Sequence, residues 1–392
     1  MINFQEVWNE KCKKYGVNKE QISIFKSVRR IIVIGDIHGD YNMMITSLKL
    51  AHLIDDDDNW TGNDTYVVQV GDQIDRCRPN GMSCDEQFMP DDEDEDLKIL
   101  YYLTNLHKKA ARHEGAVISL MGNHELMNVD GNLDYVSRAG VGMFPGKKSY
   151  FKSKKDRIDQ FSRGNELSNF LACTRYIAVI IGSNLFAHAG VIGKIAKEYN
   201  IKSINQIMTL FLLNKFNDND YVYDDISHKK YMLSNNDKSK LFYNSESPLW
   251  NRIYGYMGYF YENNGLPQKY KNEEDIKKVC AENLNILKDV YQVDKIYVGH
   301  TPMLKNGITS VCDGKVWLTD YGSSNAFNSF KTKEHLKQSQ VLEILNDGET
   351  INILKDTNHN KSYYYRENMK DTNHNKSYYY RENITDITIT KS

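Results

Sequence analysis

Residues 31–40 read IIVIGDIHGD, and residues 66–76 read YVVQVGDQIDR. In each segment a short run rich in apolar, β-branched residues stops at a glycine, and an aspartate follows. Such runs predict buried strands, and the glycine permits a tight turn in which the backbone passes close to a ligand. Three more runs stop in a similar way: AVISLM (116–121) before Gly122, YIAVIIGSNLFA (176–187) before His188, and KIYV (295–298) before Gly299.

Helical patterns separate these strands. Residues 41–53 and 97–112 carry apolar side chains at a spacing of three to four residues, which predicts helices. The acidic run DDEDED (91–96) precedes the second helix and is expected to be solvated, because negative charge is favourable at a helix N-terminus. Trp317 and residues 341–345 are expected to be later strands in the second sheet of a sandwich. This order predicts an α/β (α+β) fold in which ligands collect outside the carboxyl ends of the strands.

The charge balance excludes two classes of partner. The chain has 392 residues, and its 50 Lys and Arg residues against 52 Asp and Glu residues give a net charge of −2. This provides no positive field for a nucleic-acid backbone or an anionic membrane. The hydrophobic stretch at residues 176–190 is interrupted by Ser183, Asn184 and His188 and is too short to span a bilayer. We therefore expect no nucleic acid and no membrane as a partner.

The cysteines and the N-terminus indicate a compartment. The six cysteines show no CxxC spacing, and residues 1–30 lack the apolar block of a secretory signal. We therefore expect free thiols in a cytoplasmic protein. A redox pair of Cys77 and Cys84 is the alternative.

Three regions lie outside the strand-and-helix pattern. Residues 1–29 are expected to form an N-terminal helical extension of a catalytic domain that covers residues 30–350. Residues 191–294, which are rich in Asn and aromatic residues, are expected to form a helical cap inserted beside the site. Residues 351–392 are expected to be a low-complexity tail, because KDTNHNKSYYYREN occurs twice in tandem, starting at Lys355 and at Lys370.

Side chains that can bind metals follow each of the five apolar runs that stop at a glycine or histidine. Asp36 and His38 flank one residue, so both can point to the same side of an extended segment. The other strand-end candidates are Asp72, Asn123, His188 and His300. A mixed set of Asp, Asn and His suits Mn, Fe or Zn better than Ca or Mg, which prefer oxygen ligands alone.

The ordered motifs GDIHGD (35–40), GDQIDR (71–76), MGNHE (121–125), HAG (188–190) and GHT (299–301) resemble the phosphoprotein phosphatase family of calcineurin-like metallophosphoesterases. The strings MGNHELMNVDGNLDYVS (121–137) and SPLWNR (247–252) are similar to its Shewanella-like, bacterial-type branch. The resemblance covers about residues 30–345 and implies a calcineurin-like β-sandwich flanked by helices.

The resemblance also implies roles for individual residues. Two divalent ions would be held, one by Asp36, His38 and Asp72, and the other by Asp72, Asn123, His188 and His300. A hydroxide bridging the two ions would attack phosphorus directly. His124 would donate a proton to the leaving group, and Asp75 would orient its imidazole. Arg76, Arg252 and Asn123 would bind the substrate phosphate.

The implied function is a phosphoprotein phosphatase for phosphoserine and phosphothreonine, with phosphotyrosine also open. A dinucleoside-polyphosphate hydrolase is an alternative, because a bacterial relative with that activity shares the motifs. A non-catalytic scaffold that binds phosphoproteins is a second alternative. Such a scaffold is expected to lack a metal ligand or the acid histidine, and this sequence has all of them. Cys77 replaces the glycine that usually follows the GDxxDR arginine, so the rim of the site is unusual.

Overall fold

The computed structural model of the protein describes residues 2–356, apart from residues 17–22, 88, 90–91, 93, 144–148, 225–228, 266–268 and 332–333. Two six-stranded sheets form its centre. In strand order, the first is β1-β6-β7-β10-β12-β11 and the second is β14-β13-β2-β3-β4-β5. A separate antiparallel pair consists of β8 and β9.

The strands are Ile24–Phe25 (β1), Arg30–Ile34 (β2), Tyr66–Gln69 (β3), Ala116–Leu120 (β4), Arg175–Tyr176 (β5), Ala178–Ile181 (β6), Asn184–Ala187 (β7), Tyr221–Asp224 (β8), Lys229–Met232 (β9), Lys295–Val298 (β10), Thr309–Val311 (β11), Val316–Leu318 (β12), Gln340–Leu345 (β13) and Thr350–Lys355 (β14). The α-helices are Phe4–Lys11 (α1), Tyr41–Leu50 (α2), Asp96–Ala110 (α3), Asn123–Val129 (α4), Lys154–Phe161 (α5), Glu166–Thr174 (α6), Gly193–Glu198 (α7), Ile201–Leu212 (α8), Asn235–Lys238 (α9), Ile253–Glu262 (α10) and Glu273–Tyr291 (α11).

The residues of β2 show how the layers pack. Ile31 and Val33 belong to a buried cluster that also contains Phe186 of β7, so this cluster lies between the two sheets. Ile32 and Ile34 belong to a second cluster with residues of α2 and α3. A third cluster joins the outer face of the first sheet to α6, α8, α10 and α11. Because residues 31–34 of β2 are buried on both faces, they form a continuous apolar run.

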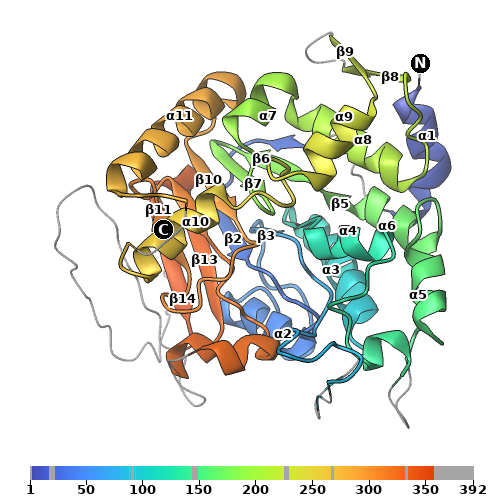
Figure 1. Cartoon of the computed structure of the whole chain (residues 1–392), viewed down its shortest axis with the longest axis horizontal. Helices are drawn as coiled ribbons and strands as arrows, with labels where there is room; N and C mark the ends of the chain where they lie inside the picture. The colour runs from blue at the N-terminus through green and yellow to red at the C-terminus, as the bar shows by residue number, and fades with distance from the viewer. Residues whose placement is uncertain are drawn as a thin grey trace.

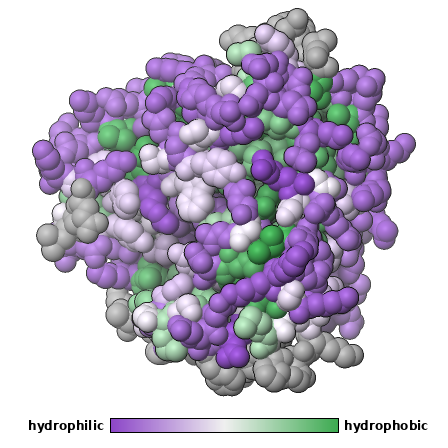
Figure 2. Space-filling model, turned by 45° about the vertical axis from the view of Figure 1, so that its right-hand side comes forward, coloured by the Kyte–Doolittle hydropathy of each residue, from purple (hydrophilic) through white to green (hydrophobic). Residues whose placement is uncertain are grey.

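The molecule is therefore a β-sandwich with helices on both sides. In Figure 1 the strands lie between α7 and α11 at the top and α2 at the bottom. The face in Figure 2 is largely hydrophilic, with a narrow band of apolar residues near its middle. None of the helices in the described part of the chain has the length and apolar character that a membrane span needs. The predicted fold class is confirmed.

Two details of the strand prediction are wrong. The run at residues 176–187 contains two antiparallel strands, β6 and β7, because the chain turns back at Gly182. Gly182 has a φ of 58°, and a Cβ there would lie 2.0 Å from Asp347 Oδ1, so glycine fits the turn. The later strands β12 and β13 belong to different sheets, whereas we expected one second sheet for both.

The expectation of free thiols is also wrong. Disulfides join Cys12 to Cys173, Cys77 to Cys84, and Cys280 to Cys312, and no free cysteine is found among the described residues. Two of the bonds join residues that are 161 and 32 positions apart. Local spacing carries no information on such pairs, because only the fold brings their Cα atoms close enough.

The outer regions contribute to the sheets. In the N-terminal segment β1 pairs with β6, and Cys12 ties the end of α1 to α6. The predicted cap region carries α7 to α11. At the other end β14 pairs with β13 as far as Lys355, which is past the predicted boundary at residue 350. Most of the predicted tail, from residue 357 onward, lies outside the described residues.

Candidate metal centre

The six predicted ligands meet at one edge of the sandwich. β2, β3 and β4 are parallel neighbours, as are β7, β10 and β12, so within each group the carboxyl ends lie together. All six side chains are buried: Asp36, His38, Asp72, Asn123, His188 and His300. The first four follow strands of the second sheet, and the last two follow strands of the first.

The donor atoms converge on Asp72. Its Oδ2 lies 3.8 Å from His38 Nε2, 3.4 Å from His188 Nε2 and 3.8 Å from His124 Nε2. Donor atoms of His38, Asp72 and His124 lie within 4.8 Å of one another, and so do those of Asp72, His188 and His300. Asp72 is thus common to two neighbouring groups of possible ligands.

Asn123 and Asp36 complete the two groups. Asn123 Oδ1 lies 2.9 Å from His188 Nε2 and 2.8 Å from His300 Nδ1. Asp36 Oδ2 lies 3.8 Å from His38 Nε2, and Asp36 Oδ1 is buried without a hydrogen-bond partner in the described structure. A buried acceptor without a donor is costly, so a cation beside Asp36 suits this arrangement. The residues present fit bound divalent metal.

Glycines at the strand ends allow the carboxylates to approach. A Cβ on Gly122 would lie 2.0 Å from Asp72 Oδ1, and a Cβ on Gly299 would lie 2.1 Å from Asp36 Oδ1. Both distances are far inside van der Waals contact. Any residue other than glycine would therefore displace a predicted ligand.

The backbone is strained at the same place. His38, Asp72, Asp75 and His300 have φ values of 49°, 51°, 72° and 68°, in the left-handed region that non-glycine residues rarely adopt. Such conformations concentrate at functional sites, where the surrounding structure holds them in place.

Buried charge determines the protonation of the ligands. Burial, followed by the charges of Asp320 and Asp72, raises the pKa of Asp36 well above its usual value. Burial opposes ionisation of Asp72 too, but His188 and His124 hold its pKa well below the usual value. Burial lowers the pKa of His38 and His300 well below that of free imidazole. Neutral imidazole is the form that binds metals.

Glu125 fixes the loop that carries Asp72. Its carboxylate accepts hydrogen bonds from the backbone N–H groups of Asp72, Gln73, Ile74 and Gly122. Burial, followed by the charge of Asp72, raises its pKa to about 7. Its position in MGNHE is the signal from which this role could have been predicted.

His124 and Asp75 form a buried pair. His124 Nδ1 lies 2.8 Å from Asp75 Oδ2. Asp75 Oδ1 accepts from Asn128 Nδ2 at 2.9 Å and lies 3.4 Å from Arg157 Nη2. The imidazole is therefore held by a carboxylate that is itself fixed from α4 and α5.

The expectation of a solvated acidic run is wrong for most of its described residues, since Asp92 is buried and accepts from the backbone N–H of Ala139 at 2.8 Å. Glu95 and Asp96 are buried. Asp96 Oδ2 accepts from Arg157 Nη2 at 2.7 Å, and Asp96 Oδ1 accepts from the backbone N–H of Asp75 at 3.2 Å. These two acids are buried because basic and backbone groups from distant segments surround them. Through these contacts they support the loop after β3.

The predicted phosphate-binding arginines have different surroundings. Arg76 is buried and donates through Nη1 to Glu95 Oε2 at 3.3 Å and to the carbonyl of Gly39 at 3.4 Å. Arg252 is partly buried and donates through Nη1 to the carbonyl of His300 and to Thr301 Oγ1, both at 3.1 Å. Arg252, at the start of α10, therefore lies directly beside a predicted ligand.

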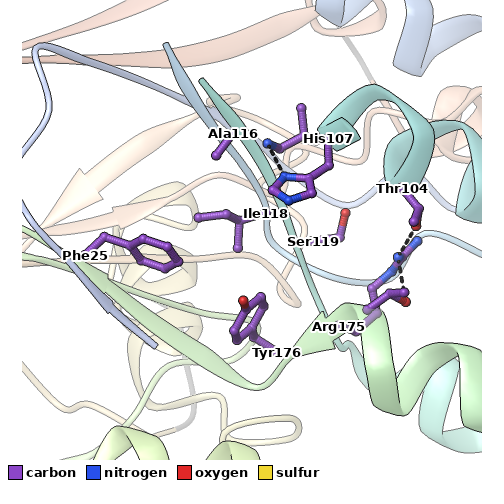
Figure 3. Close-up of a pocket in the computed structure, with 10 residues that line it drawn as sticks. Phe25, Thr104, His107, Ala116, Ile118, Ser119, Arg175 and Tyr176 are labelled. Atoms are coloured by element: carbon purple, nitrogen blue, oxygen red, sulfur yellow. Dashed lines mark hydrogen bonds between the residues drawn. The ribbon is translucent and has the colours of Figure 1, made fainter. Parts of the chain in front are cut away.

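A small cavity elsewhere contains none of the predicted site residues. Its volume is about 60 Å³, and Figure 3 shows it enclosed by Phe25, Ile118 and Tyr176, with His107 and Arg175 at its margin. Arg175 Nε donates to Gln73 Oε1 at 2.9 Å. This cavity therefore adjoins the support of the loop after β3 and not the metal ligands.

Known proteins identify the family. The model of the calcineurin-like phosphoesterases matches residues 29–304. The chain therefore belongs to the calcineurin-like phosphoesterase family, a class of metal-dependent hydrolases that its two-sheet fold and strand-end ligands fit.

Two individual proteins have sequences similar to this chain. The chain is 28% identical over 336 residues to Shewanella-like protein phosphatase 2 of Arabidopsis thaliana, which covers 76% of this chain and 73% of that protein. It is 34% identical over 269 residues to the uncharacterized protein R398 of Acanthamoeba polyphaga mimivirus, which covers 63% of this chain and 96% of that protein. The predicted resemblance to the Shewanella-like branch is confirmed.

A solved structure shows the same fold. The cold-active protein-tyrosine phosphatase of a psychrophilic Shewanella species superposes with a TM-score of 0.56 at 18% identity, over 87% of this chain and 82% of that chain.

Proposed function

We propose that this protein is a metal-dependent phosphoprotein phosphatase that hydrolyses phosphomonoesters. The observation that carries the proposal is the position of Asp72, which is shared by two groups of ligands and lies 3.8 Å from Nε2 of His124. The carboxylate of Asp72 could bind both ions of a pair, and the adjacent His124 could donate a proton to a leaving group. The Arabidopsis relative, which is named a protein phosphatase, supports the choice of a phosphoprotein as substrate.

The proposed ligands are those predicted from the sequence. Asp36, His38 and Asp72 would hold one ion, and Asp72, Asn123, His188 and His300 the other. When bound, two divalent ions neutralise phosphate charge and activate a water molecule for attack. The mixture of nitrogen and oxygen donors favours Mn, Fe or Zn.

His124 is the proposed general acid. Its Nδ1 contacts Asp75, so its Nε2 is the atom that donates a proton to the leaving oxygen. The carboxylate of Asp75 fixes the orientation of this imidazole. Arg252, Arg76 and Asn123 are proposed to position the phosphate.

The experiment is a panel of substrates for the purified full chain, with and without Mn²⁺. The panel contains phosphoserine, phosphothreonine and phosphotyrosine peptides, p-nitrophenyl phosphate and diadenosine tetraphosphate. Phosphotyrosine is included because the Shewanella neighbour is named a tyrosine phosphatase. We expect Mn²⁺-dependent release of phosphate from at least one phosphopeptide.

Two results would contradict the proposal. Hydrolysis of diadenosine tetraphosphate alone would favour the dinucleotide alternative. Tight phosphopeptide binding without turnover in the metal-loaded protein would favour a scaffold.

A further inference from the structure

Arg78 has no role among the predicted site residues, and it packs on two aromatic rings that contact the metal centre. It follows the unusual Cys77 in the loop after β3 and is partly buried. Its guanidinium carbon lies 4.5 Å from the ring centre of Phe327 and 5.7 Å from that of Tyr135. Arg78 is thus held between two aromatic rings, a setting that suits the flat guanidinium group.

The same two rings contact the site. The ring of Phe327 lies 5.6 Å from that of His38, and the ring of Tyr135 lies 4.8 Å from that of His124. Arg78 therefore lies over the side of the centre that carries a predicted metal ligand and the proposed general acid. Arg252 lies on the opposite side, beside His300.

The loop holds Arg78 in this place. The Cys77–Cys84 disulfide closes the loop, and the backbone N–H of Cys77 donates to the carbonyl of Tyr135 at 3.0 Å. Gln87 Nε2 donates to the carbonyl of Arg78 at 3.1 Å. The side chain is positioned before a ligand arrives, which lowers the entropy lost on binding.

The donors of Arg78 are only partly used. Nη1 donates to the carbonyls of Asp75 and Cys77 at 2.9 and 2.7 Å. Toward the rest of the described chain, Nε and Nη2 make no hydrogen bond. These two N–H groups form the flat fork that matches two oxygens of a phosphate. In Arg76, by contrast, the ion pair with Glu95 already engages the guanidinium.

The charge around Arg78 is negative. Burial lowers its pKa, but Asp72, Asp75, Asp320 and Asp36 all favour the charged form. An arginine remains protonated under such conditions. Once ions neutralise the carboxylates, this cation is available to an anionic ligand.

We propose that Arg78 binds the substrate phosphate opposite Arg252, in addition to Arg76, so that guanidinium groups hold the anion from both sides of the metal centre. The choice of phosphate as ligand rests on the proposed function. Arg78 would contact substrate directly, through Nε and Nη2, and the Cys77–Cys84 loop would position it.

The test measures binding of inorganic phosphate to the Mn²⁺-loaded full chain by calorimetry, without relying on turnover. Arg78→Ala should weaken phosphate binding by roughly 10- to 100-fold, the range expected when a charged hydrogen-bonding partner is lost. Metal content should not change. Arg78→Lys should recover part of the affinity, because an ammonium keeps the charge but not the fork. Arg112→Ala, a change at an exposed arginine, is the matched control.

The outcomes separate this proposal from the general function. If the Ala variant is folded and metal-loaded and binds phosphate as tightly as the parent, Arg78 is not a phosphate ligand. If the Ala variant does not fold, the phosphate affinity of the Lys variant is the deciding measurement. A Lys variant that binds phosphate as tightly as the parent overturns the two-pronged contact. Phosphate binding that depends on Arg78 in a protein that hydrolyses nothing would retain this proposal and reject the phosphatase.

Discussion

Asp72 is the residue on which both groups of ligands depend. Asp72→Asn keeps an oxygen that can accept from the backbone N–H of His124, but it removes the negative charge that both ions would share. We expect at least the roughly 10- to 100-fold loss of metal affinity that follows when even an outer partner of a ligand is removed. Most activity should disappear with it. Metal content after dialysis, measured by mass spectrometry, is the readout.

The control for Asp72 is Asp56→Asn, which changes an aspartate whose side chain is 98% exposed. This variant should keep the metal content of the parent. A purified Asp72→Asn protein with two ions and normal turnover would contradict the shared-ligand assignment.

His124 separates chemistry from metal binding. His124→Asn removes the proposed proton donor and should lower kcat by about 10²- to 10⁴-fold on a phosphoserine peptide. The loss should be smaller on p-nitrophenyl phosphate, because nitrophenolate leaves without needing a proton. Metal content should stay near that of the parent. Steady-state kinetics on the two substrates test this, with His113→Asn on the surface as control.

Equal losses on both substrates would argue against the acid role of His124. Asp75→Asn should have the same pattern in weaker form, because Asp75 acts on the imidazole and not on the substrate.

Among the elements, α11 is joined to the turn directly after β11 by the Cys280–Cys312 disulfide. The two cysteines are 32 positions apart, so Cys280→Ser with Cys312→Ser should cost roughly 3 to 4 kcal/mol through the longer loop of the unfolded chain. Removing the Cys77–Cys84 bond, which spans 7 positions, should cost roughly 2 kcal/mol. Thermal midpoints of the two double variants, with disulfides verified by peptide mapping, provide the comparison.

An excess of reductant provides the control for the disulfide prediction. It should lower the midpoint of the parent more than that of either double variant, which has already lost one bond. If reductant leaves the parent unchanged, the disulfides do not contribute to its stability.

The strands could be predicted, and candidate ligands proposed, because their signals are local. β2 and the residues Asp36 and His38 lie within a few positions of one another. The supports of the site could not be predicted in this way. Asp96 meets Arg157 from 61 positions away, and Glu95 meets Arg76 from 19 positions away. The acidic run looks solvated in the sequence because the arginines that neutralise it lie far from it along the chain.

The C-terminal end tests where the folded chain stops. Truncation after Asp356 removes polar and tyrosine-rich sequence without apolar periodicity, so the thermal midpoint should change little. Truncation after Glu349 also removes β14, whose Ile353 and Leu354 are buried, and should lower the midpoint strongly. A large drop in the thermal midpoint on truncation after Asp356 would show that residues 357–392 stabilise the folded domain.

The compartment stays a prediction. It rests on the N-terminal sequence, and the accompanying expectation of free thiols is wrong. Disulfides persist mainly in oxidising compartments. Thiol labelling of the protein in extracts from the cells that make it, quenched with acid and compared with and without reductant, would show whether the bonds exist there.

The Cys12–Cys173 bond gives the chain a ring topology. The ring contains Asp36, His38, Asp72 and Asn123, whereas His188 and His300 lie outside it. A protease that cuts once between residues 12 and 173 therefore opens the ring without dividing the molecule. The two pieces would separate on a gel only after reduction, and all six candidate ligands would remain on one covalent molecule until then.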